Sequence, residues 1–206
     1  LDPMATGVLP VFVGQATRAV EFAENGEKEY IAGLRLGLVT NTQDTSGETL
    51  ETHPVTVDRA ALEAVLPRFT GPIAQIPPMY SAIKIGGKKL YELARKGQEV
   101  ERKPRNITIF ELAVEDGSGS DWDLRVRCSK GTYVRTLCHD IGAAVGCGGC
   151  MSSLRRTMAA GFTLADSVTL DAVLQADDPA ALLLPVDAYF SGYPDLVADP
   201  EQEKRI

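Results

Sequence analysis

The hydrophobic period changes between residues 107 and 146, and this change limits the folds open to the chain. Apolar and polar residues alternate over 107–114 and again over 122–129, with turn formers between them, which predicts a hairpin of two half-buried strands. After Gly131 the period becomes helical, at Val134, Leu137, Cys138 and Ile141. A hairpin followed directly by an amphipathic helix predicts a chain that packs helices against a sheet.

Other segments agree with an α/β or α+β arrangement. Residues 28–39 alternate as a strand, and residues 58–69 have the apolar spacing of an amphipathic helix. We expect a further strand within 151–164. Two short helices are expected at 169–175 and 178–184.

Length and composition exclude several classes of protein. With 206 residues, of which 44% are apolar, the chain can bury a sizeable core, and it has neither a membrane-length apolar stretch nor a signal-peptide layout. Its four cysteines are too few and too clustered for the disulfide framework of a secreted protein. We therefore expect a cytoplasmic protein.

Cys147 and Cys150 have the spacing of a zinc or redox motif but lack matching ligands, so buried thiols and no metal are expected.

The charge is distributed unevenly along the chain. In total, 21 basic and 28 acidic residues give a net charge of −7, which disfavours a polyanionic partner. Residues 166–206 hold nine acids and two bases, so residues 1–165 carry 19 of each. Within that neutral part, 84–105 and 125–156 each carry a net +5. Such runs are commonly solvated faces, and the alternative is a surface for nucleic acid.

Two charged residues occupy unusual positions. Asp2 precedes Pro3, and Gly7 follows shortly after, so a carboxylate can be fixed in a loop ahead of an apolar strand. Arg135 lies off the apolar stripe in the first turn of the predicted helix, where it can point back across the sheet edge.

Nine blocks of sequence, in order and with compatible spacing over residues 1 to about 190, are similar to one known family. They are 1–11, 14–18, 28–30, 36–37, 42–47, 75–84, 87–97, 128–137 and 154–156. The first begins Leu1-Asp2-Pro3-Met4-Ala5-Thr6-Gly7, and the eighth contains Lys130-Gly131-Thr132-Tyr133-Val134-Arg135. Through these blocks the chain resembles the bacterial TruB family of tRNA pseudouridine synthases.

The resemblance implies a fold and a reaction. It implies an α+β pseudouridine synthase fold, with a central mixed, mostly antiparallel sheet flanked by helices. The family isomerises uridine 55 in the T loop of tRNA to pseudouridine, without a metal or organic cofactor. The expected partner is the T arm of tRNA, with no membrane and no obligate protein partner, and a monomer is expected.

The resemblance also implies roles for particular residues. Asp2 matches the essential aspartate, which attacks the ribose or the base or abstracts a ribose proton, and Arg135 matches the arginine that pairs with it. Tyr30 matches the tyrosine that stacks on the target base and is proposed to help remove its C5 proton. A strand-face tyrosine in the core is the alternative. Residues that match the base pocket are Tyr133 and Leu154. Asp44 matches an acidic residue near the site, and a structural role in a turn is equally expected.

The basic stretch 78–106 falls where the family carries an inserted loop that closes over the T arm. Phosphate contacts of this kind position RNA without reading its sequence. Lys88 to Lys96 is expected to form a short helix that presents cations. The candidate phosphate contacts are Lys84, Lys88, Lys89, Arg95, Lys96, Arg105, Lys130, Arg155 and Arg156.

The ends of the chain are expected to be incomplete. The family has a first strand before Leu1 and an RNA-binding domain of the PUA type beyond about residue 190. We therefore expect residues 1–190 to be a catalytic domain without its first strand, and 191–206 to be an acidic tail leading to an absent domain. Such a fragment is expected to be weakly active or inactive.

Two alternative functions remain open. A guide-RNA-dependent pseudouridine synthase shares the Leu-Asp-Pro block, although the acidic turn at 42–47 and the basic insertion favour the stand-alone bacterial type. A non-catalytic chaperone that folds tRNA could use the same surface.

Overall fold

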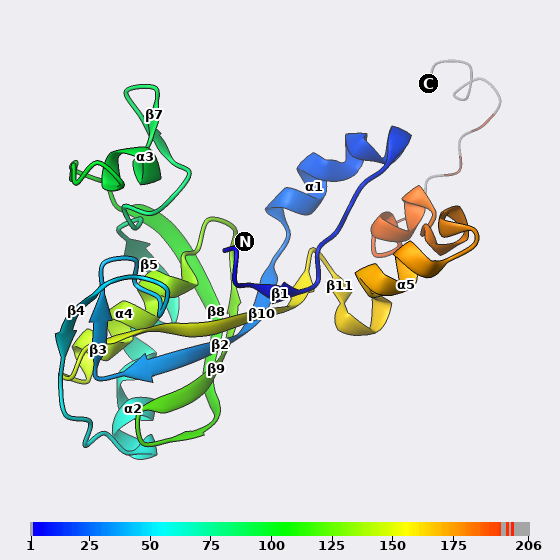
Figure 1. Cartoon of the computed structure of the whole chain (residues 1–206). Coiled ribbons are helices and arrows are strands. Elements are labelled where there is room, and N and C mark those ends of the chain that lie inside the picture. The colour runs from blue at the N-terminus through cyan, green and yellow to red at the C-terminus, as the bar shows by residue number, and fades with distance from the viewer. Residues whose placement is uncertain (1, 195–196, 198, 200–206) are drawn as a thin grey trace.

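A seven-stranded sheet organises the molecule, and the computed structural model describes residues 2–194, 197 and 199 (Figure 1). The strands lie in the order β1-β10-β2-β9-β8-β5, with β11 paired to β10. Among the described strands of this sheet, only β1 and β10 pair in parallel, so the sheet is mixed and mostly antiparallel, as predicted. Its strands are β1 (Thr6–Gly7), β2 (Lys28–Leu36), β5 (Gly71–Gln75), β8 (Arg105–Ser118), β9 (Asp121–Cys128), β10 (Gly149–Ala159) and β11 (Phe162–Thr163).

The predicted hairpin is confirmed, and it is longer than predicted. Residues 115–118 and Asp121, expected in the loop, extend β8 and β9, and only residues 119–120 make the turn. The side chains of the extension lie mostly in solvent. Polar residues are therefore compatible with the strand hydrogen bonds there, because no apolar face has to be buried. An exposed ion pair between Arg125 and Glu115 bridges the two strands there.

One face of the sheet is covered and the other is largely solvated. The core face of β9 carries Trp122, Leu124, Val126 and Cys128, all at most 4% exposed. Two helices cover this face and join the same core cluster: α2 (Arg59–Val65), extended by the 3-10 helix η2 (Leu66–Phe69), and α4 (Val134–Ala144). Both helices lie where the apolar spacing predicts them. The predicted strand over 28–39 is divided at Gly37, whose φ of 78° ends β2 before the short strand β3 (Leu38–Thr40). Strand β3 pairs with β4 (Thr49–Thr52).

A lobe and an arm project from the sheet (Figure 1). The lobe consists of β6 (Lys84–Ile85), β7 (Lys88–Lys89) and α3 (Leu90–Ala94), with the chain on either side of them. In the arm, η1 (Gly14–Ala19) and α1 (Val20–Asn25) lie beside the segment that contains η3 (Leu164–Asp166), α5 (Leu170–Gln175), η4 (Pro179–Leu182) and η5 (Val186–Phe190). Phe22 and Phe190 pack with ring centroids 5.5 Å apart, which joins segments far apart in the sequence.

Three predictions at the ends of the chain need correction or qualification. The prediction of an apolar strand after the Asp2 loop is wrong: only Thr6–Gly7 pairs with β10, and Val11 is 72% exposed. Pro10, which has no backbone N–H, interrupts the segment where a longer ladder would need one. The helix expected at 178–184 is a 3-10 turn, η4. Most of the predicted tail 191–206 lies outside the described residues.

Within the described part, no helix is long and apolar enough to cross a membrane.

The helix α4 approaches β10 through two glycines. A Cβ at Gly142 would lie 2.2 Å from the backbone nitrogen of Gly149, which is closer than any atom pair can pack. The helix therefore lies directly on the strand at this point.

We predict that Gly142→Ala lowers the free energy of unfolding by about 1 to 3 kcal/mol, because the methyl group must push the helix from the strand. Without this contact the same change would stabilise the helix by roughly 1 kcal/mol. Urea unfolding measures the difference. Ala143→Gly, at the exposed neighbouring position, calibrates the helix propensity, and an increase in stability for Gly142→Ala would contradict the packing argument.

Candidate active site

An ion pair joins the N-terminal loop to the first turn of α4. Arg135 Nε lies 2.8 Å from Asp2 Oδ2. The arginine side chain is 8% exposed and the aspartate side chain 25% exposed, so the carboxylate is the more accessible end. The loop is closed by a hydrogen bond from the Ala5 N–H to the Asp2 carbonyl, 2.9 Å long. The expectation that Arg135 points back from its helix toward Asp2 is confirmed.

The Nε contact with Asp2 is an ion pair without an aligned hydrogen bond, and the terminal nitrogens make the hydrogen bonds of Arg135. Nη1 donates to the Thr42 carbonyl at 3.1 Å and lies 3.3 Å from Asp44 Oδ2, while Nη2 donates to the Tyr80 carbonyl at 2.9 Å. The guanidinium thus joins four segments at once: the N-terminal loop, its own helix, the turn after β3 and the base of the lobe. Its planar fork suits this arrangement, because each nitrogen addresses a different acceptor.

Asp44 contacts both its own turn and Arg135. Its Oδ1 accepts hydrogen bonds from the Thr42 hydroxyl and from the Ser46 N–H and hydroxyl, which shape the turn. Its Oδ2 faces Arg135. The residue is only 5% exposed, so its charge needs this partner.

Tyr30 lies on β2 directly opposite Arg156 on β10. Burial raises the pKa of the Tyr30 phenol, and the nearby Cys128 and Asp2 act in the same direction. The Arg156 guanidinium opposes this rise by its charge and by hydrogen bonding to the phenol. Arg156 also donates to the Val8 carbonyl in the N-terminal segment that carries Asp2, so Tyr30 lies opposite a residue that contacts this segment.

The two pocket candidates differ in their surroundings. Tyr133 is half-buried at the start of α4, and both of its backbone polar groups bind the Gln75 side chain, at 2.8 and 3.0 Å. Leu154 is 5% exposed on β10 and belongs to the core cluster. Gln75, at 3% exposure, is a bracing residue that the sequence reasoning missed. A polar residue ahead of Pro77 and Pro78 was its only signal.

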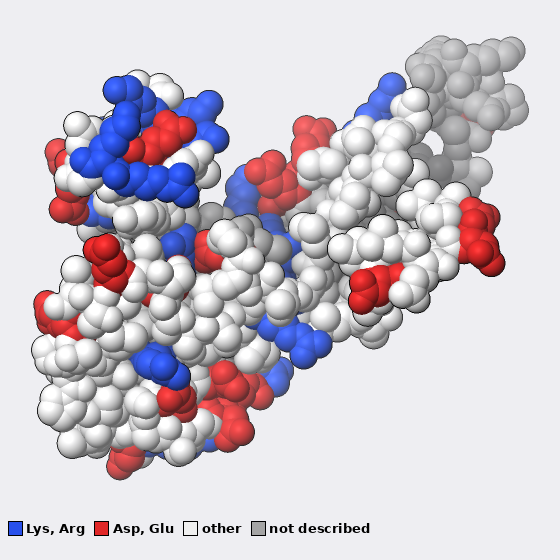
Figure 2. Space-filling model, viewed as in Figure 1, with Lys and Arg blue, Asp and Glu red and all other residues white. Residues whose placement is uncertain are grey.

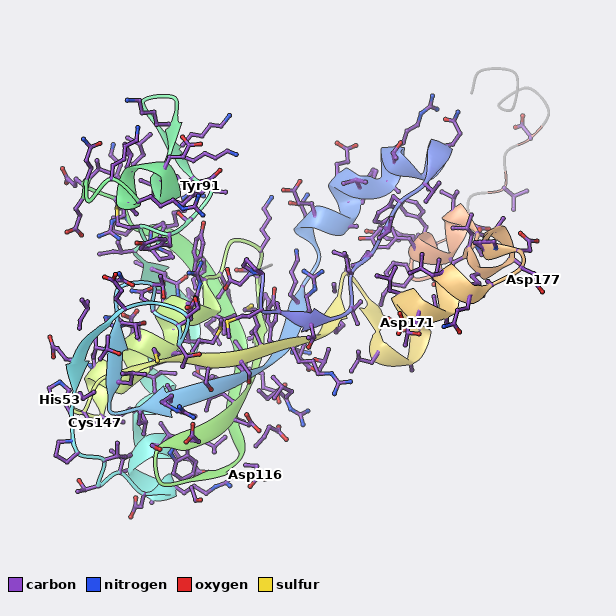
Figure 3. The ribbon with its side chains drawn as sticks, viewed as in Figure 1. His53, Tyr91, Asp116, Cys147, Asp171 and Asp177 are labelled. Atoms are coloured by element: carbon purple, nitrogen blue, oxygen red, sulfur yellow. The ribbon has the colours of Figure 1, made fainter. Side chains whose placement is uncertain are left out.

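The candidate phosphate contacts fall into two groups. Those in the lobe are Lys84, Lys88, Lys89, Arg95 and Lys96, and all but the half-buried Lys89 are exposed. The helix expected over 88–96 is shorter, because α3 covers only Leu90–Ala94 and the first two lysines belong to β7. Figure 3 labels Tyr91 on α3, and Lys89 Nζ and the Arg95 guanidinium each lie 5.4 Å from its ring centre.

The second group lies on the sheet. Arg105 opens β8 and Arg155 lies on β10, both exposed. Lys130 follows β9 and hydrogen-bonds Asn25 at the end of α1. Arg156 is only half exposed, and its Nε donates to the Val8 carbonyl at 2.7 Å. These residues are therefore not equally free to bind a phosphate.

The cysteines are free thiols, and all four are buried. Burial raises the pKa of Cys138 to about 12 and that of Cys128 to about 11, so the neutral thiol persists at ordinary pH. Cys147 lies beside His53 at the end of the molecule away from the lobe (Figure 3). Among residues 2–194, 197 and 199, no three His, Cys, Asp or Glu side chains gather as metal ligands.

Comparisons with known proteins agree with the site. Residues 1–134 match the family model of the TruB family pseudouridylate synthase N-terminal domain, and residues 135–191 match that of the tRNA pseudouridylate synthase B C-terminal domain. A tRNA pseudouridine synthase B from Burkholderia lata is 52% identical over 208 residues, and one from Azoarcus sp. is 50% identical over 210. Both cover 100% of this chain, which spans 65% and 69% of those proteins.

A solved structure is also similar. A crystal structure of a Cbf5-Nop10-Gar1 complex contains a chain with a TM-score of 0.64 and 32% sequence identity. The similarity covers 84% of this chain and 43% of that one.

We predict that Arg135→Met destabilises the protein by about 3 to 5 kcal/mol, because it leaves carboxylates without their buried cation. Urea unfolding measures the loss. Adding Asp44→Asn removes one of the stranded charges and is expected to restore part of the stability. Equal unfolding midpoints for Arg135→Met and the unmodified chain would show that the ion pairs carry no net stabilisation.

Proposed function

The chain belongs to the TruB family of pseudouridylate synthases, and from this membership we propose that it isomerises uridine 55 in the T loop of tRNA to pseudouridine. The observation that carries the proposal is the ion pair between Asp2 and Arg135, which presents a partly accessible carboxylate beside a buried cation. Residues 1–190 are the proposed catalytic domain. Its sheet supports treating them as one unit, because β9 and β10 fall in different family matches and both pair with β2.

The reaction moves one bond and is balanced without an oxidant or a reductant. The bond from N1 of the base to C1′ of the ribose breaks, the base turns, and C5 is joined to C1′. C5 loses its proton and N1 gains one, so substrate and product are isomers. The enzyme has to flip the nucleotide out of the loop, hold the base while it is detached, and provide an anion and a proton acceptor.

Asp2 is the proposed anion. Its role is attack on the ribose, attack on the base, or abstraction of a ribose proton, and each of these needs an ionised carboxylate. Arg135 Nε, at 2.8 Å, stabilises that charge where water is partly excluded. Because Thr42, Asp44 and Tyr80 hold the guanidinium, the cation is fixed before the substrate arrives.

Tyr30, Tyr133 and Leu154 are the proposed walls of the base pocket. Tyr30 provides an aromatic face for stacking and a phenol for the C5 proton. Its place opposite Arg156, which binds Val8 in the segment after Asp2, supports this role. Leu154 provides apolar surface beside it on β10. Stacking and apolar contact would recover part of the few kcal/mol that flipping costs.

The lobe is the proposed contact with the T arm. Figure 2 shows Lys and Arg side chains gathered over it, with an acidic patch among them. Tyr80, whose carbonyl holds Arg135, lies at the base of the lobe, so RNA bound by the lobe would lie near the ion pair. Arg105, Lys130 and Arg155 are proposed to extend the phosphate contacts along the sheet.

We predict that Asp2→Asn lowers pseudouridine formation by at least about a hundredfold, because the ionised carboxylate is lost. Tritium release from C5-labelled tRNA transcript, with protein in excess over RNA, measures it even for a slow catalyst. Binding to a T-arm hairpin is expected to persist. Asp171→Asn, on α5 in the arm (Figure 3), is the matched control and should keep full activity.

Three outcomes distinguish the alternatives. Release from bare transcript supports a stand-alone enzyme, whereas release only with an added guide RNA supports the guide-dependent type. If the chain folds tRNA but the unmodified protein forms no pseudouridine even in excess over RNA, these 206 residues are not an enzyme by themselves and the chaperone remains.

We predict that replacing Lys88 and Lys96 together by Gln weakens T-arm binding and reduces the slope of log affinity against log salt by about 0.9 for each phosphate that is no longer neutralised. Anisotropy titrations at several salt concentrations measure both quantities. Arg68→Gln, in η2 beside α2 and away from the lobe, removes an exposed charge as a control. An equal effect of the control would mean that only the total charge matters.

A further inference from the structure

Arg156 lies between the loop that carries Asp2 and the strand that carries Tyr30. Its backbone carbonyl accepts from the Val8 N–H at 2.8 Å, and its Nε donates to the Val8 carbonyl at 2.7 Å. One residue therefore holds both backbone polar groups of Val8, which is itself only 3% exposed.

The contact with the loop leaves no room for adjustment. Gly7 lies opposite Arg156 in the parallel pair β1 and β10, and its φ is +94°. A Cβ at Gly7 would lie 2.1 Å from the Arg156 carbonyl oxygen. The loop can therefore approach β10 this closely only through a glycine, and the backbone of β10 at residue 156 limits its position.

The other side of Arg156 faces Tyr30. The two residues are direct partners in the antiparallel pair β2 and β10, so their side chains leave the sheet on the same face. The positive charge of the guanidinium lowers the pKa of the phenol, against the rise caused by burial. Arg155, the neighbouring arginine, is exposed on the opposite face.

We propose that Arg156 is a positioning residue for the reaction: it ties the Asp2 loop to Tyr30 and sets the distance between the carboxylate and the phenol. This proposal rests on the proposed function. It replaces the simpler expectation of a phosphate contact, because the Nε is committed to Val8 and the side chain leaves the sheet on the same face as Tyr30.

The groups that face Tyr30 explain what the arginine contributes chemically. Cys128 on β9 and Asp2 in the loop, together with burial, raise the pKa of the phenol, and Arg156 on β10 is the cation that lowers it. Removing the arginine charge should therefore move the ionisation of Tyr30 to higher pH and loosen the Asp2 loop.

The test compares two variants. Arg156→Met keeps most of the length of the side chain and removes its charge, whereas Arg156→Lys keeps a positive charge and removes the planar guanidinium. For Arg156→Met we expect about a hundredfold slower single-turnover isomerisation, the scale of a misplaced reacting group. T-arm affinity should stay near that of the unmodified chain. Arg156→Lys should recover part of the rate. Arg125→Met, on the solvent face of the sheet, is the matched control.

A second measurement does not depend on activity. The Tyr30 phenolate is titrated by ultraviolet absorbance, with the Tyr30→Phe protein subtracted to remove the other tyrosines. Arg156→Met should shift the Tyr30 midpoint to higher pH, and Arg156→Lys should shift it less.

The outcomes separate the possible failures. A weaker T-arm affinity and a smaller salt slope, with an unchanged Tyr30 titration, would overturn the proposal in favour of a phosphate contact. If the isomerisation rate falls only in proportion to the fraction of folded protein, and the Tyr30 titration is again unchanged, Arg156 has only a structural role. If the unmodified chain forms no pseudouridine, the proposed function itself fails, and the titration still tests the link between Arg156 and Tyr30.

Discussion

A guanidinium that is almost fully buried needs a counter-charge and hydrogen-bond acceptors, and Arg135 finds both in distant parts of the chain, although its Nε makes only the ion pair with Asp2. Asp2, Thr42, Asp44 and Tyr80 converge on it, although 78 residues separate Asp2 from Tyr80. Leaving any of these groups unpaired in such a site would be costly. The same contacts that stabilise the fold therefore fix the cation of the proposed active site in place.

The sheet supplies a second constraint. Its covered face carries the apolar core at one end and, along the same rows of side chains, Tyr30 and Arg156 at the other. A strand places every second residue on one face, so the positions that continue the core row must either stay apolar or find polar partners. Tyr30 and Arg156 pair with each other and with the Asp2 loop, which turns the end of the core into a polar site.

The total charge of the chain conceals where its cations lie. The described acids of the C-terminal part lie mainly in the arm, as Figure 3 shows for Asp171 and Asp177, whereas the lobe carries a cluster of lysines and arginines. Screening limits the reach of exposed charges to about 10 Å at moderate salt. A polyanion at the lobe would therefore respond to the local cations more than to the net −7.

Sequence alone determined the periods of β2, β8, β9, α2 and α4, the covered face of β9, and the pairing of Asp2 with Arg135 that the family resemblance implies. These depend on residue order and on shared motifs. Sequence alone did not predict the features that depend on the solvent exposure of side chains or on a contact with a residue distant in the sequence. The hairpin turn at 119–120 depends on which side chains meet solvent, and β1 is short because Pro10 has no N–H to continue the ladder. Only the tertiary structure showed that Gln75 braces Tyr133 and that Arg156 is committed to Val8, because those partners lie 58 and 148 residues away and meet only when the sheet assembles.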